Sequence, residues 1–410
     1  MRRLQASRSL LFGALLLSAC QFSSAFEPTN TPGPAQPTLG VLNTPTREAS
    51  PGSTPSPTPV PSPSPMPATQ LAALPICGEA SGARPEELTL TFAAEWDGDL
   101  EIYSIQADGS GLIQLTSNSS DELDPAWSPD GKRLAYVELR NTEEQLFVVD
   151  ANGQQGRLLV PETLGPIVYP SWSPAGDKIA FRNLRDLYVV DVETGEAFNL
   201  TQNTGPFPLE LSISADGSML AFNAQSDVDP TINNKLFVIN ADGTGLREFT
   251  LSGARSVRDP MWRPTESLIL FQGSGPIEGF ELYLASLDGT IEKLRGQATL
   301  GAFSPAWSPD GSMIAYIAYN GHTFDALHVL AADEGLDITA LELSDKAEGE
   351  DAISRYSWAP DGRHIAYTIA DQNVDTVGVD LYVLDICDGT TVAVAEAVYE
   401  YSSLSWRPLP

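Results

Sequence analysis

The chain has 410 residues and a formal net charge of −31 at pH 7, because 54 Asp and Glu outnumber 23 Lys and Arg. This balance argues against a nucleic-acid partner, since phosphate binding needs clustered basic side chains. With three cysteines and three histidines in the whole chain, we expect no zinc site, no other metal and no cofactor.

Residues 1–19 are predicted to form a signal peptide. Arg2 and Arg3 precede an apolar run, residues 10–17, that is too short to span a bilayer as a permanent helix. The stretch Leu17-Ser18-Ala19-Cys20 resembles the lipobox of bacterial lipoproteins, which implies cleavage before Cys20 and lipidation of that cysteine. The alternative is an ordinary secretory signal, which would leave Cys20 as a free thiol.

Residues 20–75 are predicted to be a lipid-anchored, disordered tether. From about Glu27 to Ala68 the chain is mostly Pro, Thr, Ser, Gly and Ala, and this composition buries too little apolar surface to fold. Extended at about 3.1 Å per residue, the tether reaches up to roughly 150 Å. We therefore expect the folded part, residues 76–410, to stand away from the membrane.

Cys77 and Cys387 lie near the two ends of this folded part. An isolated pair of cysteines in an oxidising compartment usually forms one disulfide. We therefore expect a disulfide that joins the ends of the domain.

The folded part is organised by a repeat. One copy reads Pro125-Ala126-Trp127-Ser128-Pro129-Asp130-Gly131. The anchor position of each copy is a tryptophan or, once, an isoleucine: Trp127, Trp172, Ile213, Trp262, Trp307, Trp358 and Trp406. A turn glycine recurs in phase with the anchors, at Gly109, Gly153, Gly195, Gly243, Gly289, Gly335 and Gly389. Two markers in phase predict seven structural units.

Each unit contains strand-like segments and no helical period. After Trp127 come three short apolar stretches, residues 134–137, 146–149 and 158–160, separated by turn residues. Together with the anchor strand they make four antiparallel strands in about 46 residues, which is typical of one propeller blade. The sequence predicts an all-β propeller of seven blades, with six as the alternative, and anchors that pack between blades.

This repeat resembles the WD-like repeats of TolB-type β-propellers over about residues 88–410. The pieces most similar to that family are Trp127-Ser128-Pro129-Asp130-Gly131, its copy at residues 307–311, and residues 99–103 followed by 108–111. The resemblance implies the propeller architecture. The low-complexity segment 21–75 and the seven units differ from TolB, which has an α/β domain before its propeller and often six blades.

The ends of the repeat region complement each other. Residues 402–408 are an anchor strand with no unit after it, and residues 88–94 are a second strand with no anchor before it. We expect both termini to share one blade, which closes the ring and removes exposed strand edges.

Ligands of propellers bind where loops meet around the central channel. Three residues before each anchor lie the candidate ligand-binding positions: Asp124, Tyr169, Glu210, Asp259, Ser304, Arg355 and Ser403. Their carboxylates, arginine and tyrosine suit a polar or cationic ligand, and the alternative is that they only cap strand ends.

Other polar clusters are weaker candidates. His322 and His328, separated by Asp325, lie in a predicted hairpin, where exposed polar side chains are the favoured interpretation over a metal site. Acidic loops with Asp227, Asp229, Asn233 and Asn234, or with residues 348–351, match no known calcium spacing. Solvated charge is the favoured interpretation for both loops.

The sequence contains no Gly-x-Ser-x-Gly elbow and no nucleotide-binding fingerprint. We therefore predict a monomeric, non-catalytic binding or scaffolding propeller, lipid-anchored at the cell envelope, that recognises a protein, peptide or glycan. The alternative is an envelope enzyme, a glycan hydrolase or lyase that uses paired carboxylates at the channel mouth.

Overall fold

The computed structural model describes most of the chain from residue 83 onward. The described residues are 77, 83–96, 98–140, 143–161, 164–183, 186–202, 207–225, 234–251, 256–274, 279–294, 301–319, 324, 326–333, 335, 337–343, 351–371, 378–400 and 403–409. All of them belong to one compact unit, Pro57–Pro410. The predicted signal peptide and the whole of the predicted tether, including Cys20, lie outside the described residues.

The regular secondary structure of the described residues is almost entirely β-strand, with one short 3-10 helix, η2 (Pro85–Glu87). Five sheets have four antiparallel strands each. The first two contain β4 (Asp121–Trp127), β5 (Arg133–Arg140), β6 (Glu143–Asp150) and β7 (Arg157–Val160), then β8 (Val168–Trp172), β9 (Lys178–Arg182), β10 (Leu187–Asp191) and β11 (Ala197–Asn199). The next two contain β12 (Phe207–Ile213), β13 (Met219–Gln225), β14 (Lys235–Asn240) and β15 (Arg247–Phe249), then β16 (Ser256–Trp262), β17 (Leu268–Ser274), β18 (Phe280–Ser286) and β19 (Ile291–Lys293). The fifth contains β20 (Ala302–Trp307), β21 (Met313–Ala318), β22 (Ala326–Ala331) and β23 (Asp337–Glu342).

The sixth sheet has eight strands, in the order β24-β25-β26-β27-β1-β2-β3, with β28 paired to β1. Its strands are β24 (Asp351–Trp358), β25 (His364–Asp371), β26 (Gly378–Asp385), β27 (Thr391–Tyr399), β1 (Thr89–Ala94), β2 (Glu101–Gln106), β3 (Ile113–Gln114) and β28 (Ser405–Trp406). The C-terminal strand therefore pairs with the first strand of the chain, with Trp406 opposite Leu90.

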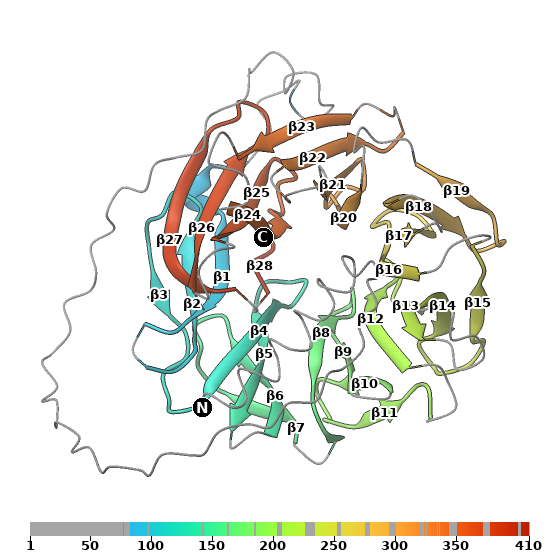
Figure 1. Ribbon diagram of the computed structural model, residues 1–410. Coiled ribbons are helices and arrows are strands. Elements are labelled where there is room, and N and C mark those ends of the chain that lie inside the picture. The colour runs from blue at the N-terminus through green and yellow to red at the C-terminus, as the bar shows by residue number, and fades with distance from the viewer. Residues whose placement is uncertain are drawn as a thin grey trace, which may run out of the picture. The chain divides into compact units, whose positions relative to one another are not determined.

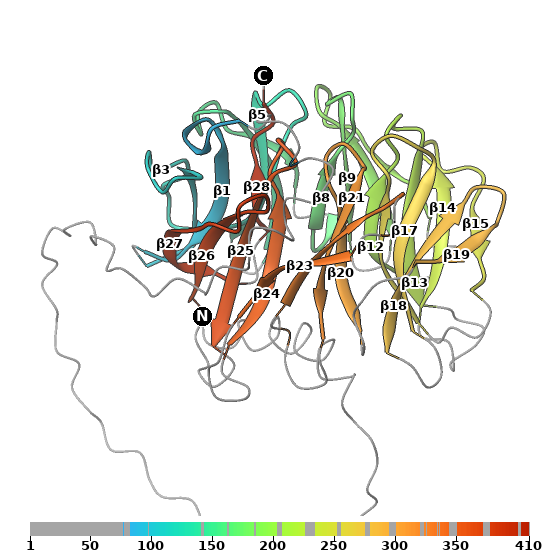
Figure 2. The same cartoon turned by 90° about the horizontal axis from the view of Figure 1, so that it is seen from above.

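The sheets stand around a common centre, with the anchor strands β4, β8, β12, β16, β20, β24 and β28 innermost (Figure 1). Figure 2 shows the propeller from the side. The fold is an all-β propeller, as the sequence predicts. The strands β28, β1, β2 and β3 form a group of four beside β24 to β27, and the count of seven blades stays a prediction that a truncation can test.

The Ser-Pro-Asp-Gly motif forms the tight turn from the first strand to the second. The Ser128 hydroxyl donates to Oδ1 of Asp130 at 2.7 Å and accepts the backbone N–H of Arg133 at 2.9 Å. Gly131 has φ +64°, a left-handed conformation that glycine adopts without steric cost. The motif thus satisfies its own polar groups and fixes the hairpin.

The anchor tryptophans join each sheet to the one before it. Their side chains are 4 to 8% exposed. The Trp172 indole donates to the carbonyl of Ala126 at 2.9 Å, and the Trp358 indole to that of Ala306 at 3.1 Å. In both cases the acceptor residue immediately precedes the previous anchor. Trp172 and Trp358 therefore fill sheet interfaces and also hydrogen-bond across them.

The turn glycines lie where the fourth strand of the preceding blade comes close. A Cβ atom on Gly153 would lie 1.9 Å from the carbonyl oxygen of Leu115, and one on Gly243 would lie 3.2 Å from that of Leu200. Both glycines also have positive φ, +74° and +83°. At Gly153 and Gly243 glycine is therefore required by conformation and by contact between neighbouring units.

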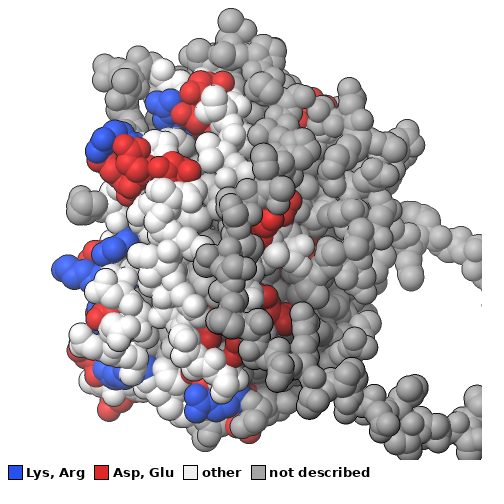
Figure 3. Space-filling model, turned by 90° about the vertical axis from the view of Figure 1, so that its left-hand side faces the viewer, with Lys and Arg blue, Asp and Glu red and all other residues white. Residues whose placement is uncertain are grey.

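One side of the propeller, which carries β3 and β27, shows charged side chains along its border and a largely uncharged middle (Figure 3). Exposed apolar side chains from these strands are Ile113 on β3 and Val392 on β27, at 57 and 40% exposure. The charged side chains visible on this side are therefore of both signs.

Candidate functional site

The seven candidate positions, here called the inner ring, are Asp124, Tyr169, Glu210, Asp259, Ser304, Arg355 and Ser403. Six lie on the innermost strands, and Ser403 lies two residues before β28. Near each of the six, the pairing register with the second strand is shifted. A β-bulge re-aims the side chain of an inner strand, and here it recurs at one place in successive sheets.

Four inner-ring residues have left-handed backbone conformations, which residues other than glycine seldom adopt. The φ values are +51° at Asp124, +56° at Tyr169, +49° at Asp259 and +49° at Ser304. Each of these residues precedes a proline, whereas Glu210, Arg355 and Ser403 do not. The X-Pro pair two to three residues before an anchor is therefore the sequence signature of this conformation.

Neighbouring inner-ring residues hydrogen-bond to each other. The Asp124 carboxylate accepts both the backbone N–H and the hydroxyl of Ser403, each at 3.3 Å. The Asp259 backbone N–H donates to Oε2 of Glu210 at 2.9 Å, and the backbone N–H of Ser304 donates to the Asp259 carboxylate. Sequence positions far apart are thus joined in two connected segments, Ser403 to Asp124 and Glu210 to Ser304.

Glu210 and Asp259 form a pair of acidic side chains on adjacent blades. Burial, and secondly the charge of Glu210, raise the pKa of Asp259 to about 8. Burial also raises the pKa of Glu210, and the N–H of Asp259 and the charge of Arg258 oppose this shift. The pair of carboxyl groups therefore retains a bound proton near neutral pH.

Charged side chains from several blades act on the Tyr169 hydroxyl. Burial raises the pKa of its hydroxyl to about 12, and the charges of Glu210 and Asp124 add to the shift, while Arg355 and Arg182 oppose it. The guanidinium of Arg182 lies 5.7 Å from the centre of the Tyr169 ring. Because Arg355 is on β24 and Tyr169 on β8, the inner ring is compact enough for groups on non-adjacent blades to interact.

Sequence reasoning missed a second layer of polar residues, each ten positions after an anchor. Arg182 donates to the carbonyl of Pro208 at 3.2 Å, and Asn223 to that of Val257 at 3.1 Å. Gln272 donates in the same way to Ala302. Each acceptor lies five positions before the next anchor. The spacing of ten residues from each anchor is visible in the sequence and could have identified these side chains. They hydrogen-bond adjoining blades to each other beside the inner ring.

Two further contacts hold the inner ring in place. The Arg355 Nε donates to the backbone carbonyl of Glu400 at 2.7 Å. The hydroxyl of Tyr356, next to Arg355, donates to the carbonyl of Ser304 and, at 2.7 Å, to that of Ala315. Neither contact follows from the repeat, because Tyr356 stands where four other units have proline and Glu400 belongs to no repeat marker.

The TolB beta propeller domain family matches residues 68–181 and 122–276, a joint span of just over half of the chain. The chain belongs to the TolB β-propeller family. A protein named Protein TolB homolog from Chlorobium luteolum is 28% identical over 159 residues, which cover 38% of this chain and 35% of that protein. The chain spans about a third or less of the length of the curated relatives that it matches.

Two solved structures are similar to this TolB-type propeller in fold. The oligogalacturonate lyase in complex with manganese has a TM-score of 0.58 and 18% identity, covering 78% of this chain and 86% of the lyase. TolB from Acinetobacter baumannii has a TM-score of 0.50 and 16% identity, covering 76% of this chain and 79% of that protein. At these identities the likeness shows the shared fold.

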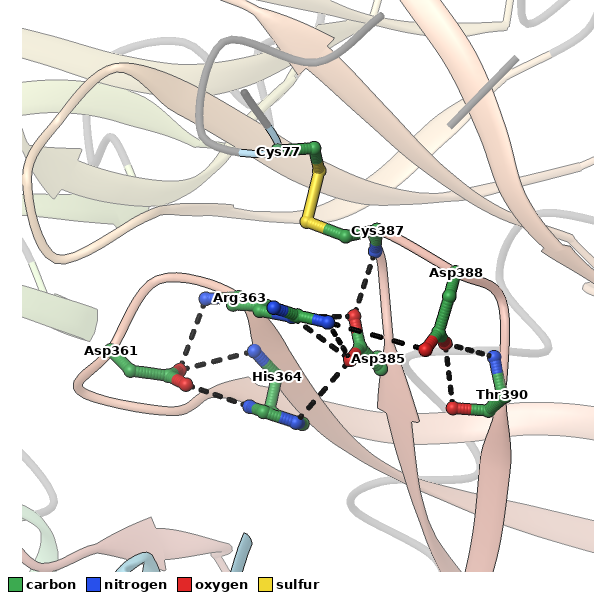
Figure 4. Close-up of a disulfide and its surroundings, with 8 residues drawn as sticks. All are labelled: Cys77, Asp361, Arg363, His364, Asp385, Cys387, Asp388 and Thr390. Atoms are coloured by element: carbon green, nitrogen blue, oxygen red, sulfur yellow. Dashed lines mark hydrogen bonds and ion pairs between the residues drawn. A yellow bond between two sulfur atoms is a disulfide. The ribbon is translucent and has the colours of Figure 1, made fainter. Parts of the chain in front are cut away.

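The TolB-type propeller contains the expected disulfide between Cys77 and Cys387 (Figure 4). The Cys387 N–H donates to Asp385 at 2.9 Å, and the same carboxylate accepts the Arg363 guanidinium at 2.9 Å. His364 follows Arg363 in the chain, and its ring nitrogen Nδ1 lies 2.7 Å from Oδ2 of Asp361. The disulfide therefore attaches residue 77 to a well-bonded corner of β25 and β26.

The prediction that His328 lies in an exposed hairpin is wrong. His328 lies within β22 and is 8% exposed. Its Nδ1 lies 3.3 Å from the Tyr316 hydroxyl and 3.3 Å from Oδ1 of Asp337. The prediction fails because residues 326–331 form a third strand rather than a loop. His322 and Asp325 lie outside the described residues, so the pair as a metal site stays untested.

The acidic loops named as weak calcium candidates lie largely outside the described residues. Asn234 is described, and it is buried just before β14 with its amide 3.5 Å from the Ser256 hydroxyl. In the part of the propeller that the structure describes, no three His, Cys, Asp or Glu side chains are grouped in a way that could hold a metal. No helix among the described residues is long and apolar enough to cross a membrane.

Proposed function

We propose that this TolB-type propeller is a non-catalytic binding module whose inner ring recognises a polar segment of a partner that carries a positive group. The observation that carries this proposal is the contact between Glu210 and Asp259, whose acidic groups lie partly buried on adjacent inner strands. The charge of Glu210 raises the pKa of Asp259, so the two carboxyl groups repel when both are ionised. An amine or guanidinium group from a ligand would relieve that repulsion and replace the retained proton.

The same region also offers hydrogen-bond donors. The Nε atoms of Arg182 and Arg258 are buried without a hydrogen-bond partner among the described residues. Buried donors without acceptors are costly, and a ligand that brings carbonyl or hydroxyl oxygens would satisfy them. A polypeptide or glycan segment supplies both kinds of group. A relative named Tol-Pal system protein TolB supports a protein or peptide over a glycan as the partner.

We also propose that the propeller is held at the cell envelope by lipidated Cys20 and the tether 20–75, as a monomer with residues 76–410 folded. The support is the sequence of the first residues. Changing Cys20 to Ser should release the protein from the membrane fraction. Mass spectrometry of the mature N-terminus should find an acylated cysteine, and an unmodified terminus at another residue would contradict the anchor.

The experiment for the binding function uses affinity capture from envelope extracts with three versions of the full chain. The first is the natural sequence, and the second carries E210Q and D259N. The third carries D242N and D288N, which remove two carboxylates from exposed outer turns. We expect a partner that the natural and control chains retain and the inner-ring variant loses. Equal capture by all three chains would show that the inner ring does not bind it.

A catalytic role is the second candidate, because one acidic group that retains its proton beside another is an arrangement used for acid–base catalysis. Its assay is incubation of the full chain with oligogalacturonates and with other envelope glycans, followed by analysis of the products. Cleavage that the E210Q and D259N changes abolish would replace the binding proposal with an enzymatic one. Intact glycans would agree with the binding role.

A further inference from the structure

Two acidic side chains are buried together at the seam between β2 and β4, which belong to different sheets. Glu101 begins β2 and is 1% exposed, and Glu122 is the second residue of β4 and is 0% exposed. Burying one ionised carboxylate without a counter-charge is costly, and burying two side by side is more so. The seam therefore needs a positive charge or a proton at this place.

Asn118 holds the two carboxyl groups together. Its backbone N–H donates to Oε1 of Glu101, and its side-chain amide donates to Oε1 of Glu122, both at 2.7 Å. The remaining oxygens, the two Oε2 atoms, are buried and receive no hydrogen bond from a donor group among the described residues. Asn118 therefore brings the two carboxyl groups to one place, and the interaction with Glu101 raises the pKa of Glu122. A proton on one carboxyl group would let it donate to the other, which an ionised carboxylate cannot do.

The groups that face the pair do not neutralise it. Arg140, at the end of β5, forms an ion pair with Glu138 at 2.6 Å. The charges of Glu101, Glu122 and Glu138 all act on the Tyr136 hydroxyl, and together with burial they raise its pKa. Asp121, next to Glu122, accepts the backbone N–H of Leu100 at 3.0 Å. The surroundings therefore add negative charge and favour a retained proton.

A hollow of about 410 Å³ is lined by Ser119, Ser120, Leu139 and Arg140. The backbone N–H of Ser120 donates to the Asn118 side chain at 2.6 Å. Ser120, which lines the hollow, thus contacts the asparagine that bridges the pair.

We propose that Glu101 and Glu122 share one proton and that this proton locks the seam between β2 and β4, so that the propeller loosens there when the pH rises. This inference concerns the ring itself and does not rest on the proposed binding function. Burial, and secondly the hydrogen bond to Glu101, raise the pKa of Glu122 from 4.5 to about 9. Because the folded state holds the proton more tightly than the unfolded state, the free energy of unfolding falls as pH rises from 4.5 to about 9.

The test compares denaturant midpoints of the full chain across this pH window with those of the E122Q variant. Glutamine keeps the shape and can donate to Glu101 without a proton from solvent. We expect the midpoint of the natural chain to fall more steeply with pH than that of E122Q. E292Q, which changes an exposed glutamate on β19, should keep the slope of the natural chain. Equal slopes for the natural chain and E122Q would overturn the proposal.

A second measurement does not depend on the stability of the variant. The infrared carbonyl band of a protonated carboxylic acid should be present in the natural chain at neutral pH and weaker in E122Q than in E292Q. An unchanged band would overturn the shared proton. So would a bound metal ion that elemental analysis finds in the natural chain and not in E122Q, because the cation would then occupy the place of the proton.

Discussion

The guanidinium of Arg407 lies 5.1 Å from the centre of the Trp127 ring, and its Nε donates to the carbonyl of Gly131 at 2.8 Å. The same relation recurs where Arg263 covers Trp307 and donates to the carbonyl of Gly311 at 2.9 Å. The C-terminal segment therefore contacts the sheet of β4 in the same way that the end of β16 contacts the sheet of β20. The indole of Trp406 also donates to Ser357 at 3.1 Å.

Truncation after Tyr401 should destabilise the whole propeller, because it removes β28 and exposes the inner edge of β1. The single change W406A should cost about 3 to 5 kcal/mol of unfolding free energy. Thermal unfolding followed by circular dichroism checks both variants, and a chain that lacks only Leu409 and Pro410 is the control. If the chain truncated after Tyr401 melts like the full chain, the segment is a tail and the six-bladed interpretation holds.

Gly153 and Gly289 distinguish two reasons why this repeated turn has a glycine, namely backbone conformation and a close contact with the neighbouring unit. Both have positive φ, but a Cβ on Gly153 would lie 1.9 Å from the Leu115 carbonyl, whereas one on Gly289 would meet nothing within 4 Å. G289A should cost about 1 to 2 kcal/mol from backbone conformation alone. G153A should cost at least about 2 kcal/mol more, because the backbone must move. Urea unfolding of both variants measures the difference, and equal losses would mean that the close approach is unimportant.

Loss of the disulfide should lower stability strongly. It closes a sequence separation of 310 residues, for which the chain-entropy account gives an upper limit of about 5 to 6 kcal/mol. The measurement is the denaturant midpoint of C387S and of the natural chain with and without reductant. Reductant should lower the midpoint of the natural chain to that of C387S and leave C387S unchanged. A natural chain insensitive to reductant would contradict this role.

Binding of a cationic partner should strengthen as the pH rises towards 8. The pKa of Asp259 is raised from 3.8 to about 8, so below that value the ligand must displace a proton. The free energy of unfolding should fall over the same window, because the folded state retains the proton. Calorimetry of the captured partner in two buffers of different ionisation enthalpy counts the protons released. D259N should remove the pH dependence, and affinity independent of pH in the natural chain would contradict the assignment.

The propeller fold was predictable because its repeat depends on local structure. Trp127, the turn that follows it and Gly153 each indicate the conformation of their own segment. The disulfide was predictable because only two cysteines follow the tether. The contact between Glu101 and Glu122 was not, since it joins different sheets and depends on the register of β2 against β4. The error at His328 has a similar origin, because strand length decides whether a polar residue is buried. Asp259 was found by its spacing from Trp262, but its altered pKa depends on burial and on Glu210, which the sequence does not show.

Site-specific photo-crosslinking in intact cells tests the binding role of the inner ring most directly. A photoreactive residue replaces Ser304, which is exposed within the inner ring, or Thr244, which is exposed on an outer turn. Illumination should join the partner to the chain from position 304 and not from position 244, and the E210Q and D259N changes should abolish the adduct. An adduct that forms from position 244 and is absent at 304 would contradict the account and place recognition on the outer turns.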